Sequence, residues 1–235
     1  MKTRALPWIT LSCAVAAWLL HRVPAMASAL EFNRTAFAQG EHWRIATAHF
    51  VHFNDSHLHW DLVGLLVFGC WAETLSRRRW ALALGIAAIA IPLLVAWREP
   101  HLATYRGLSG LACVPFGLLV ISLVRTARRH RDGMLQAAAW AASLGFLAKT
   151  IYELTAGQTL FVDAGAAFVP VPLAHLAGFV IGVATAMPAT DTVTRPARSP
   201  GRQDGGCNTP GLPRETPPAS RSHWPRAHAG ASPGR

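Results

Sequence analysis

The sequence predicts an all-α membrane protein with six spanning helices. A membrane-spanning helix requires about 20 mostly apolar residues, and a soluble domain would not contain six such runs. The runs lie at residues 6–21, 57–75, 80–97, 107–124, 134–153 and 169–187. Basic clusters support this count, because with six spans all of them fall on one side of the membrane.

The basic clusters also predict the orientation of the chain. Lys2 and Arg4 precede the first run, and SRRRW, RTARRHRDG and a basic tail follow the second, fourth and sixth runs. Positively charged segments tend to stay in the cytoplasm. We therefore expect a multi-pass protein of the bacterial inner (plasma) membrane with both termini cytoplasmic. The outward loops are then residues 22–56, 98–106 and 154–168.

The composition divides the chain into two parts. The formal charge is +10 although only 14% of the 235 residues are charged. Residues 188–235 are rich in Pro, Gly, Ser and Arg and hold few large apolar side chains. Such a segment cannot bury enough apolar surface to offset its ordering entropy. We expect a six-span membrane domain at residues 1–187 and a disordered tail at 188–235.

Two of the six runs have features that weaken their assignment as spans. The first run has the basic start, apolar middle and Ala-x-Ala-like end of a cleaved signal peptide. The charge pattern after it would be the same with or without cleavage. The fifth run carries Lys149, Tyr152 and Glu153 near its end.

Polar residues gather near the outward ends of three spans. Ionisable groups inside a span are costly and by default indicate function. Spans two, four and six all run from outside to inside, so their first residues lie at a similar depth. These residues are His57, His59 and Asp61, then Gly107, Ser109 and Gly110, and His175. One serine and at least two histidines thus share one layer.

This layer predicts a serine nucleophile with a histidine base. The hydroxyl of Ser109 is a poor nucleophile unless a base such as His175 takes its proton, and burial keeps a histidine neutral and basic. The attack forms an oxyanion, which requires hydrogen-bond donors. His57, the amides at the start of the Ser109 helix and the side chain of Asp61 are available. Asp61 lies four residues after His57, so the two share one helix face.

Small residues predict that the fourth and sixth spans pack closely. Ala174, Gly178 and Gly182 repeat every four residues and form one face of the sixth span. Gly107 and Gly110 flank Ser109 in the same way on the fourth. Such faces let membrane helices approach each other, which would bring His175 within reach of Ser109.

Simpler explanations exist for each feature alone. A serine in a membrane helix often bonds to its own backbone, and a histidine more often packs than catalyses. The outward histidines could form a metal cluster, but no H-E-x-x-H pattern appears and acidic partners are scarce. Cysteines show neither metal-finger nor disulfide spacing. We expect no metal and no cofactor. These histidines and cysteines are His49, His52, His57, His59 and His101, and Cys13, Cys70, Cys113 and Cys207.

Three stretches resemble the rhomboid intramembrane serine proteases: HWRIATAHFVHFNDSHLHWDLVGLLVFGCWAE, YRGLSG and AHLAGFVIG. The resemblance covers about residues 5–187, and its ordered combination of W-R, H-x4-H, G-x-S-G and A-H-x-x-G-x-x-x-G is specific. It implies a six-span fold that keeps the first span, with Ser109 as nucleophile and His175 as base. It also implies that His57 helps to form the oxyanion hole. Trp43 and Arg44 match the start of the structural first loop, and Glu73 matches an acidic residue near the end of span two.

Position 61 departs from the pattern. Rhomboids commonly have Asn there as an oxyanion donor, whereas this chain has Asp61. A carboxylate would repel an oxyanion, so Asp61 must be protonated, turned away or otherwise employed. We expect a neutral donor, because an isolated carboxylate in a membrane layer tends to take up a proton.

A narrower resemblance is to the rhombosortases, the rhomboid branch linked to C-terminal Gly-Gly sorting signals. It rests on LEFNRTAFAQGEHWRIATAHFVH, YRGLSG and LAKTIYELTAGQ before VPLAHLAGFVIG. It implies transmembrane protein substrates in the lipid bilayer, with a small-residue motif, a span and a basic end, and no nucleic acid. Two alternatives remain: a non-catalytic rhomboid-like protein that binds membrane clients, and a small transporter, although no pair of broken helices is evident.

Overall fold

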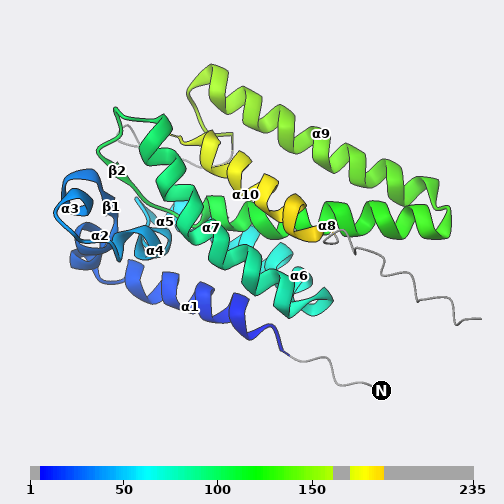
Figure 1. The fold of residues 1–235 in the computed structure, drawn as a ribbon, viewed down its shortest axis with the longest axis horizontal. Helices are drawn as coiled ribbons and strands as arrows, with labels where there is room; N and C mark the ends of the chain where they lie inside the picture. Colours follow the sequence, from blue (N-terminus) through cyan, green and yellow to red (C-terminus); the bar gives the residue numbers. More distant parts are fainter. Residues whose placement is uncertain (1–5, 161–169, 188–235) are drawn as a thin grey trace, which may run out of the picture. The chain divides into compact units, whose positions relative to one another are not determined.

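The computed structural model describes residues 6–160 and 170–187, which form a bundle of helices (Figure 1). The predicted disordered tail at 188–235 lies outside the described residues. The elements are α1 (Trp8–His21), α2 (Pro24–Leu30), β1 (Phe32–Asn33), α3 (Arg34–Ala38), α4 (Arg44–Thr47), the 3-10 helix η1 (Ala48–Phe50), α5 (Asp55–Gly64), the π-helix η2 (Leu65–Gly69), α6 (Cys70–Leu75), α7 (Arg77–Arg98), β2 (Thr104–Tyr105), α8 (Ser109–His130), α9 (Gly133–Ala156) and α10 (Pro172–Ala186).

Each of the six predicted spans coincides with helical structure. The second is made of α5, η2 and α6 in succession, and each of the other five coincides with one helix. Within the described residues, α7 and α8 are long and apolar enough to cross a membrane, and α1 and α2 pass together but are bent by 113°. The helix α10 is apolar and shorter. The chain is thus an all-α membrane protein by these elements, and the count of six spans stays a prediction.

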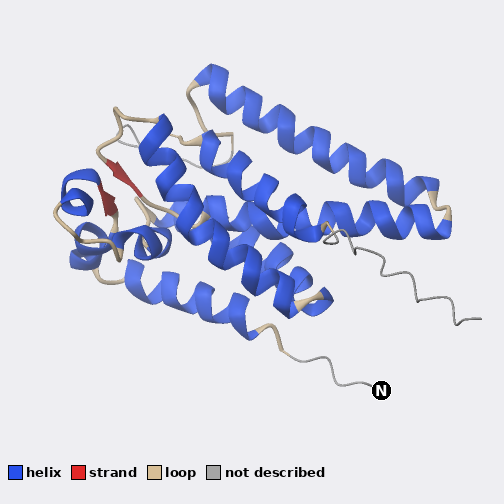
Figure 2. Cartoon of the chain, in the orientation of Figure 1, coloured by secondary structure: helices blue, strands red, loops and turns tan. Residues whose placement is uncertain are grey.

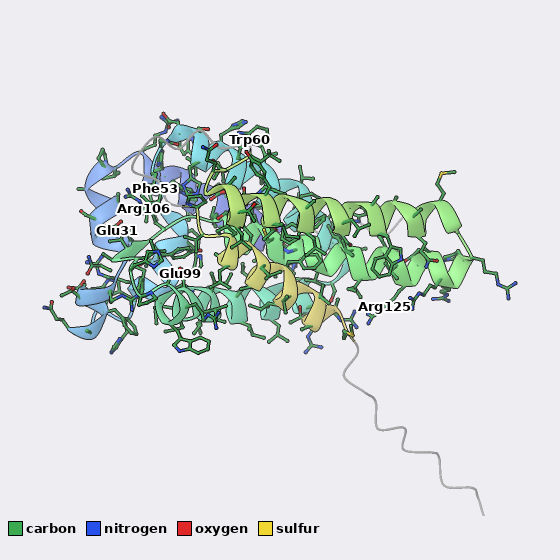
Figure 3. The ribbon with its side chains drawn as sticks, turned by 90° about the horizontal axis from the view of Figure 1, so that it is seen from above. Glu31, Phe53, Trp60, Glu99, Arg106 and Arg125 are labelled. Carbon is green, nitrogen blue, oxygen red and sulfur yellow. The ribbon has the colours of Figure 1, made fainter. Side chains whose placement is uncertain are left out.

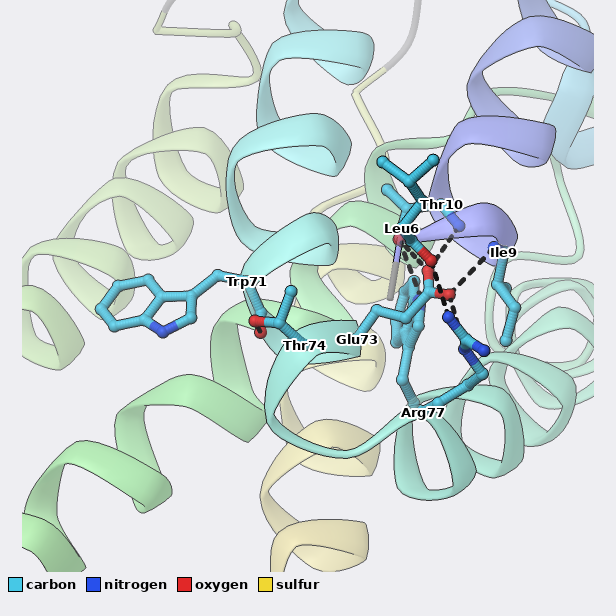
Figure 4. A network of polar contacts seen from close by, with 8 residues as sticks. Leu6, Ile9, Thr10, Trp71, Glu73, Thr74 and Arg77 are labelled. Atoms are coloured by element: carbon cyan, nitrogen blue, oxygen red, sulfur yellow. Dashed lines mark hydrogen bonds and ion pairs between the residues drawn. The ribbon is translucent and has the colours of Figure 1, made fainter. Parts of the chain in front are cut away.

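A buried carboxylate attaches α1 to α6 and α7 (Figure 4). Glu73 accepts hydrogen bonds from the backbone N–H groups of Ile9 and Thr10 at 3.1 and 2.9 Å, and from the Thr10 hydroxyl at 2.9 Å. The first amides of a helix have no partner inside the helix, so Glu73 caps α1. Thr10 in turn accepts a hydrogen bond from the indole of Trp80 at 3.0 Å. This network supports the expectation that the first apolar run stays part of the bundle.

Glycines set the distance between α8 and α10. A methyl group at Gly178 would overlap the backbone carbonyl of Gly110, and one at Gly182 would overlap that of Val114. From the other side, a methyl group at Gly117 would overlap the carbonyl of Phe179. The close packing that the small-residue face predicts is therefore confirmed, with α8 and α10 side by side (Figure 1).

The only strands of the described residues lie in the loops before the second and fourth predicted spans (Figure 2). The all-α prediction missed this short ribbon, in which Phe32 pairs with Tyr105 and Asn33 with Thr104 in antiparallel register. Strands of two residues have too little alternation to be seen in a sequence. The ribbon joins the first long loop to the segment that leads into Ser109.

Arg44, to which the resemblance assigns a structural role, contacts several groups of the first loop. Its guanidinium donates to the carbonyls of Ser28 and Glu31 at 2.8 and 2.9 Å and lies 2.6 Å from the carboxylate of Glu41. The neighbouring Trp43 is exposed. Arg44 thus satisfies loop carbonyls that water would otherwise have to satisfy.

Candidate active site

Ser109 is the first residue of α8, and the backbone before it has a conformation that favours glycine. Gly107 has φ of +127°, a region that residues with a side chain rarely adopt. A Cβ at Gly107 would lie 2.7 Å from the ring of His57. Gly107 also donates its N–H to the carbonyl of Ala48 at 3.0 Å. The first glycine of G-x-S-G therefore serves both the turn into α8 and the close approach of His57.

His57 lies in the first turn of α5, whose start is fixed by a capping residue. The side chain of Asn54 accepts a hydrogen bond from the N–H of His57 at 2.9 Å, the usual role of an N-cap. The His57 side chain is buried. Its ring stacks on that of Phe53, with ring centres 5.8 Å apart. The cap and the stacking together fix the direction of the imidazole.

His175 lies in the first turn of α10, which begins with Pro172. Nδ1 of His175 lies 3.2 Å from Oε2 of Glu153, at the end of α9. In a neutral imidazole one nitrogen donates and the other accepts. When Nδ1–H donates to the Glu153 carboxylate, Nε2 is the free acceptor. This is the form in which a histidine can take a proton from a serine.

Ser109, His175 and His57 line one small cavity. Its volume is about 30 Å³, enough for about one water molecule. The lining residues are Phe53, His57, Tyr105, Arg106, Ser109, Val171 and His175. The structure thus brings together the three residues that the sequence analysis predicts to be the nucleophile, the base and an oxyanion donor. Gly110 packs against the carbonyl of Ala174 on α10, and Asp61, Trp43 and Arg44 do not line this cavity.

Asp61 lies behind His57 and contacts two histidines. Oδ2 of Asp61 is 3.3 Å from Nε2 of His57, as the spacing of four predicts, and 3.1 Å from Nε2 of His52. The N–H of Leu108 also points at Nε2 of His52, at 3.3 Å. If the proton lies on His52, this nitrogen donates to the carboxylate and Leu108 loses its acceptor. If the proton lies on Asp61, the single lone pair of this nitrogen faces two donors, Asp61 and the N–H of Leu108, and can fully accept from only one of them. The neutral-donor interpretation of Asp61 stays a prediction.

Tyr105 is a cavity residue that the sequence did not indicate. Its hydroxyl is buried and has no hydrogen-bond partner within residues 6–160 and 170–187. Burial raises the pKa of Tyr105, so the hydroxyl keeps its proton and can donate. A buried donor without a partner costs about 1–3 kcal/mol. A group that enters the cavity could satisfy it.

A second cavity of about 330 Å³ lies beside the first. Phe53 and Arg106 line both cavities. The guanidinium of Arg106 lies 3.9 Å from the centre of the Phe53 ring and 3.6 Å from the carboxylate of Glu31. Figure 3 shows these three residues grouped together, far from Arg125, which donates to the carbonyl of Ala186 where α10 ends.

His49 and His52 lie buried in the first loop, where their contacts hold the fold together. Nε2 of His49 lies 3.1 Å from the carbonyl of Ala88 on α7. Burial lowers the pKa of His49 to about 4, so His49 is neutral at pH 7. Burial also lowers the pKa of His52, against the opposing effect of Asp61. Within the described part of the chain, no three His, Cys, Asp or Glu side chains are arranged to hold a metal ion.

Glu153 is the functional candidate that the sequence reasoning missed. Its place near the end of an apolar run counted against that run as a span. The same observation indicates function, since an ionisable group inside a span is costly. The partner could not be read from the sequence, because Glu153 and His175 are 22 residues apart on different helices.

The similarity of the chain to known proteins indicates its family. The model of the Rhomboid domain matches residues 39–191, which include Ser109, His175, His57 and Glu153. No curated protein matches the chain significantly. The match covers well over half of the chain and contains every residue that lines the small cavity. The chain therefore belongs to the rhomboid family.

Proposed function

We propose that the protein is an intramembrane serine endopeptidase that cleaves membrane-anchored substrates near the outer face of the membrane. One observation carries this proposal: Ser109 and His175, from two helices in glycine-mediated contact, line the same cavity as His57. Rhomboid family members are typically serine intramembrane proteases. The cavity of about 30 Å³ leaves room for one small reacting group beside Ser109 and His175.

The proposed reaction uses Ser109 and His175 in two half-reactions. Oγ of Ser109 attacks the carbonyl carbon of the scissile peptide while Nε2 of His175 takes the hydroxyl proton. The C–N bond then breaks, and His175 gives the proton to the departing amine. Water next attacks the acyl-enzyme ester and loses a proton to His175. The ester bond breaks, and the proton returns to Oγ of Ser109.

Donors around the cavity would stabilise the oxyanion formed in each half-reaction. The free N–H groups in the first turn of α8 point out of its N-terminus, and the ring of His57 faces the same cavity. The unpartnered hydroxyl of Tyr105 is a further donor. Removing one donor from an oxyanion hole typically lowers kcat by about 100- to 1000-fold.

A narrower proposal concerns the substrate and the membrane. The rhombosortase-like stretches favour substrates with a C-terminal Gly-Gly motif, an apolar span and a basic end. The basic clusters favour an inner-membrane protein with cytoplasmic termini, which places the Ser109 layer toward the outer face. A reporter protein with one apolar span and such a motif tests this substrate class. Cleavage that is lost when the Gly-Gly pair is replaced by Val-Val would support it.

Covalent labelling tests the proposed activity without a known substrate. A fluorescent fluorophosphonate should label the purified protein in detergent, and Ser109→Ala should abolish the label. Ser122→Ala is a matched control, because Ser122 lies further along α8 and donates only to the carbonyl of Leu118. If the wild-type protein stays unlabelled while it still binds membrane clients, the non-catalytic alternative replaces this proposal.

A further inference from the structure

We propose that Glu153 is a positioning residue that makes the Ser109–His175 pair into a Ser–His–Glu triad. This inference rests on the proposed function, because it assigns a role through His175. Glu153 does not line the cavity; it contacts His175 at Nδ1, the nitrogen that does not take the proton from Ser109. It acts by orienting the imidazole and by stabilising its charge.

The two oxygens of the Glu153 carboxylate contact different side chains. Oε2 lies 3.2 Å from Nδ1 of His175, and Oε1 lies 2.6 Å from Nζ of Lys149. The Glu153 side chain is 2% exposed, against 14% for His175. Each oxygen thus has one of these two partners. Lys149 lies on α9, as Glu153 does, and His175 lies on α10.

The hydrogen bond from Nδ1 determines which nitrogen of His175 can act as a base. With the hydrogen on Nδ1, Nε2 carries the free lone pair, and His175 lines the cavity that Ser109 also lines. A carboxylate behind the imidazole holds this tautomer and orientation, and it stabilises the imidazolium that forms when Ser109 loses its proton. Glu153 therefore supplies what the third member of a serine-protease triad supplies.

Lys149 makes a buried carboxylate tolerable at this position. A charged group without a partner in a membrane interior is strongly unfavourable. Lys149 is 27% exposed at its side chain, so its ammonium can reach water while it pairs with Glu153. Cys113 on α8 is a further titratable group that interacts with both Lys149 and Glu153.

The other buried glutamate shows how a purely structural carboxylate is arranged. Glu73 accepts from two backbone amides and the Thr10 hydroxyl and lies 3.2 Å from Nε of Arg77 (Figure 4). All these partners hold helices together, and no cavity residue is among them. Glu153 differs because one of its oxygens is committed to the proposed catalytic base. Glu73→Gln is therefore a matched control for Glu153→Gln.

Time courses of fluorophosphonate labelling separate binding from chemistry. Glu153→Gln should lower the maximal labelling rate by about 100-fold or more, the order seen when a triad acid is neutralised. The probe concentration for half-maximal rate should change less than about 3-fold, since Glu153 is not in the cavity. Glu153→Asp keeps the charge and should recover at least about a tenth of the lost rate. Glu73→Gln should lower the melting temperature and leave the rate per folded protein unchanged.

Lys149→Met separates orientation of His175 from the ion pair. It removes the pair, and at a pH high enough to keep Glu153 ionised the carboxylate still lies behind the imidazole, so the labelling rate at that pH should stay within about 10-fold of wild type. A loss as large as that of Glu153→Gln would show that the ion pair matters and would overturn the proposal. If Glu153→Gln does not fold, Glu153→Met decides, because it also removes the carboxylate: a wild-type maximal rate per folded protein in that variant would overturn the proposal.

Failure of this inference differs from failure of the proposed function. Labelling that depends on Ser109 but is unchanged in Glu153→Gln removes only the role of Glu153. Labelling that survives in Ser109→Ala removes the proposed function and this inference with it. Labelling that requires Ser109 and falls in Glu153→Gln at an unchanged half-maximal concentration, with recovery in Glu153→Asp, supports both.

Discussion

Gly178 on α10 lies directly against the backbone carbonyl of Gly110 on α8, the residue that follows Ser109. No side chain separates the two helices at this point. The proposed base lies on α10 one turn before Gly178, and the proposed nucleophile lies one residue before Gly110. The distance between base and nucleophile is thus set by a contact between two glycines.

Replacing Gly178 by alanine should therefore damage both stability and activity. The added methyl group would overlap the Gly110 carbonyl, so α10 must shift, at a cost of about 1–3 kcal/mol. Fluorophosphonate labelling per folded protein should fall at least about 10-fold, because small displacements of reacting groups are costly. Gly85→Ala on α7 is the control, since nothing lies within 4 Å of its added methyl group. Equal behaviour of the two variants would contradict this account of the helix contact.

The role of Asp61 is tested by comparing the variants Asp61→Asn and Asp61→Ala. If Asp61 is a neutral donor, Asp61→Asn should keep most of the labelling rate, and Asp61→Ala should lose about 100- to 1000-fold, the range for one oxyanion donor. If Asp61 instead acts as a carboxylate on His57, both variants should lose activity to a similar extent. Rates measured across pH decide between the two. Normal rates in both variants would leave Asp61 with a structural role only.

The attachment of α1 should be sensitive to a single hydroxyl. Thr10→Val removes a donor to Glu73 and the acceptor for Trp80, so two buried polar groups lose a partner. We expect a loss of about 1–3 kcal/mol of stability, measured by thermal denaturation in detergent. Thr74→Val is the control, because exposed Thr74 only bonds to the carbonyl of Trp71 nearby (Figure 4). If both variants melt as the wild type does, α1 is not held by this network.

His49 should make the stability depend on pH in the acidic range. The unfolded chain binds a proton at His49 below about pH 6.5, whereas the folded chain binds it only below about pH 4. Stability is therefore full above pH 6.5 and falls as the pH drops toward 4, by about 3 kcal/mol. The variant His49→Gln keeps a hydrogen-bond donor for the Ala88 carbonyl, but its side chain does not bind a proton in this pH range. Its melting temperature should fall less between pH 6.5 and 4 than that of the wild type.

The sequence predicted those parts of the fold that depend on periodicity and composition. Apolar runs located the helices, and the four-residue spacing of Ala174, Gly178 and Gly182 predicted the α8–α10 contact. The shared depth of the first residues of three spans predicted that Ser109, His175 and His57 lie in one layer, and the three line one cavity. These inferences depend on short-range patterns or on depth in the membrane, and both can be read from a single sequence.

Contacts between distant segments could not be predicted in this way. The bond between Glu153 and His175 depends on how α9 packs beside α10, and no spacing encodes that packing. The same holds for Tyr105, which reaches the cavity because β2 pairs with β1. Two-residue strands have no detectable periodicity. Their positions follow from tertiary packing, which overrides local propensity.

The non-additivity of Ser109 and His175 tests the central claim most directly. Labelling rates with a fluorescent fluorophosphonate are measured for Ser109→Ala, His175→Ala and the double variant, each corrected for folded protein. Two groups that act as one unit give losses that do not add. The account predicts that each single variant abolishes labelling and that the double variant is no worse. Substantial labelling in either Ser109→Ala or His175→Ala would contradict the account.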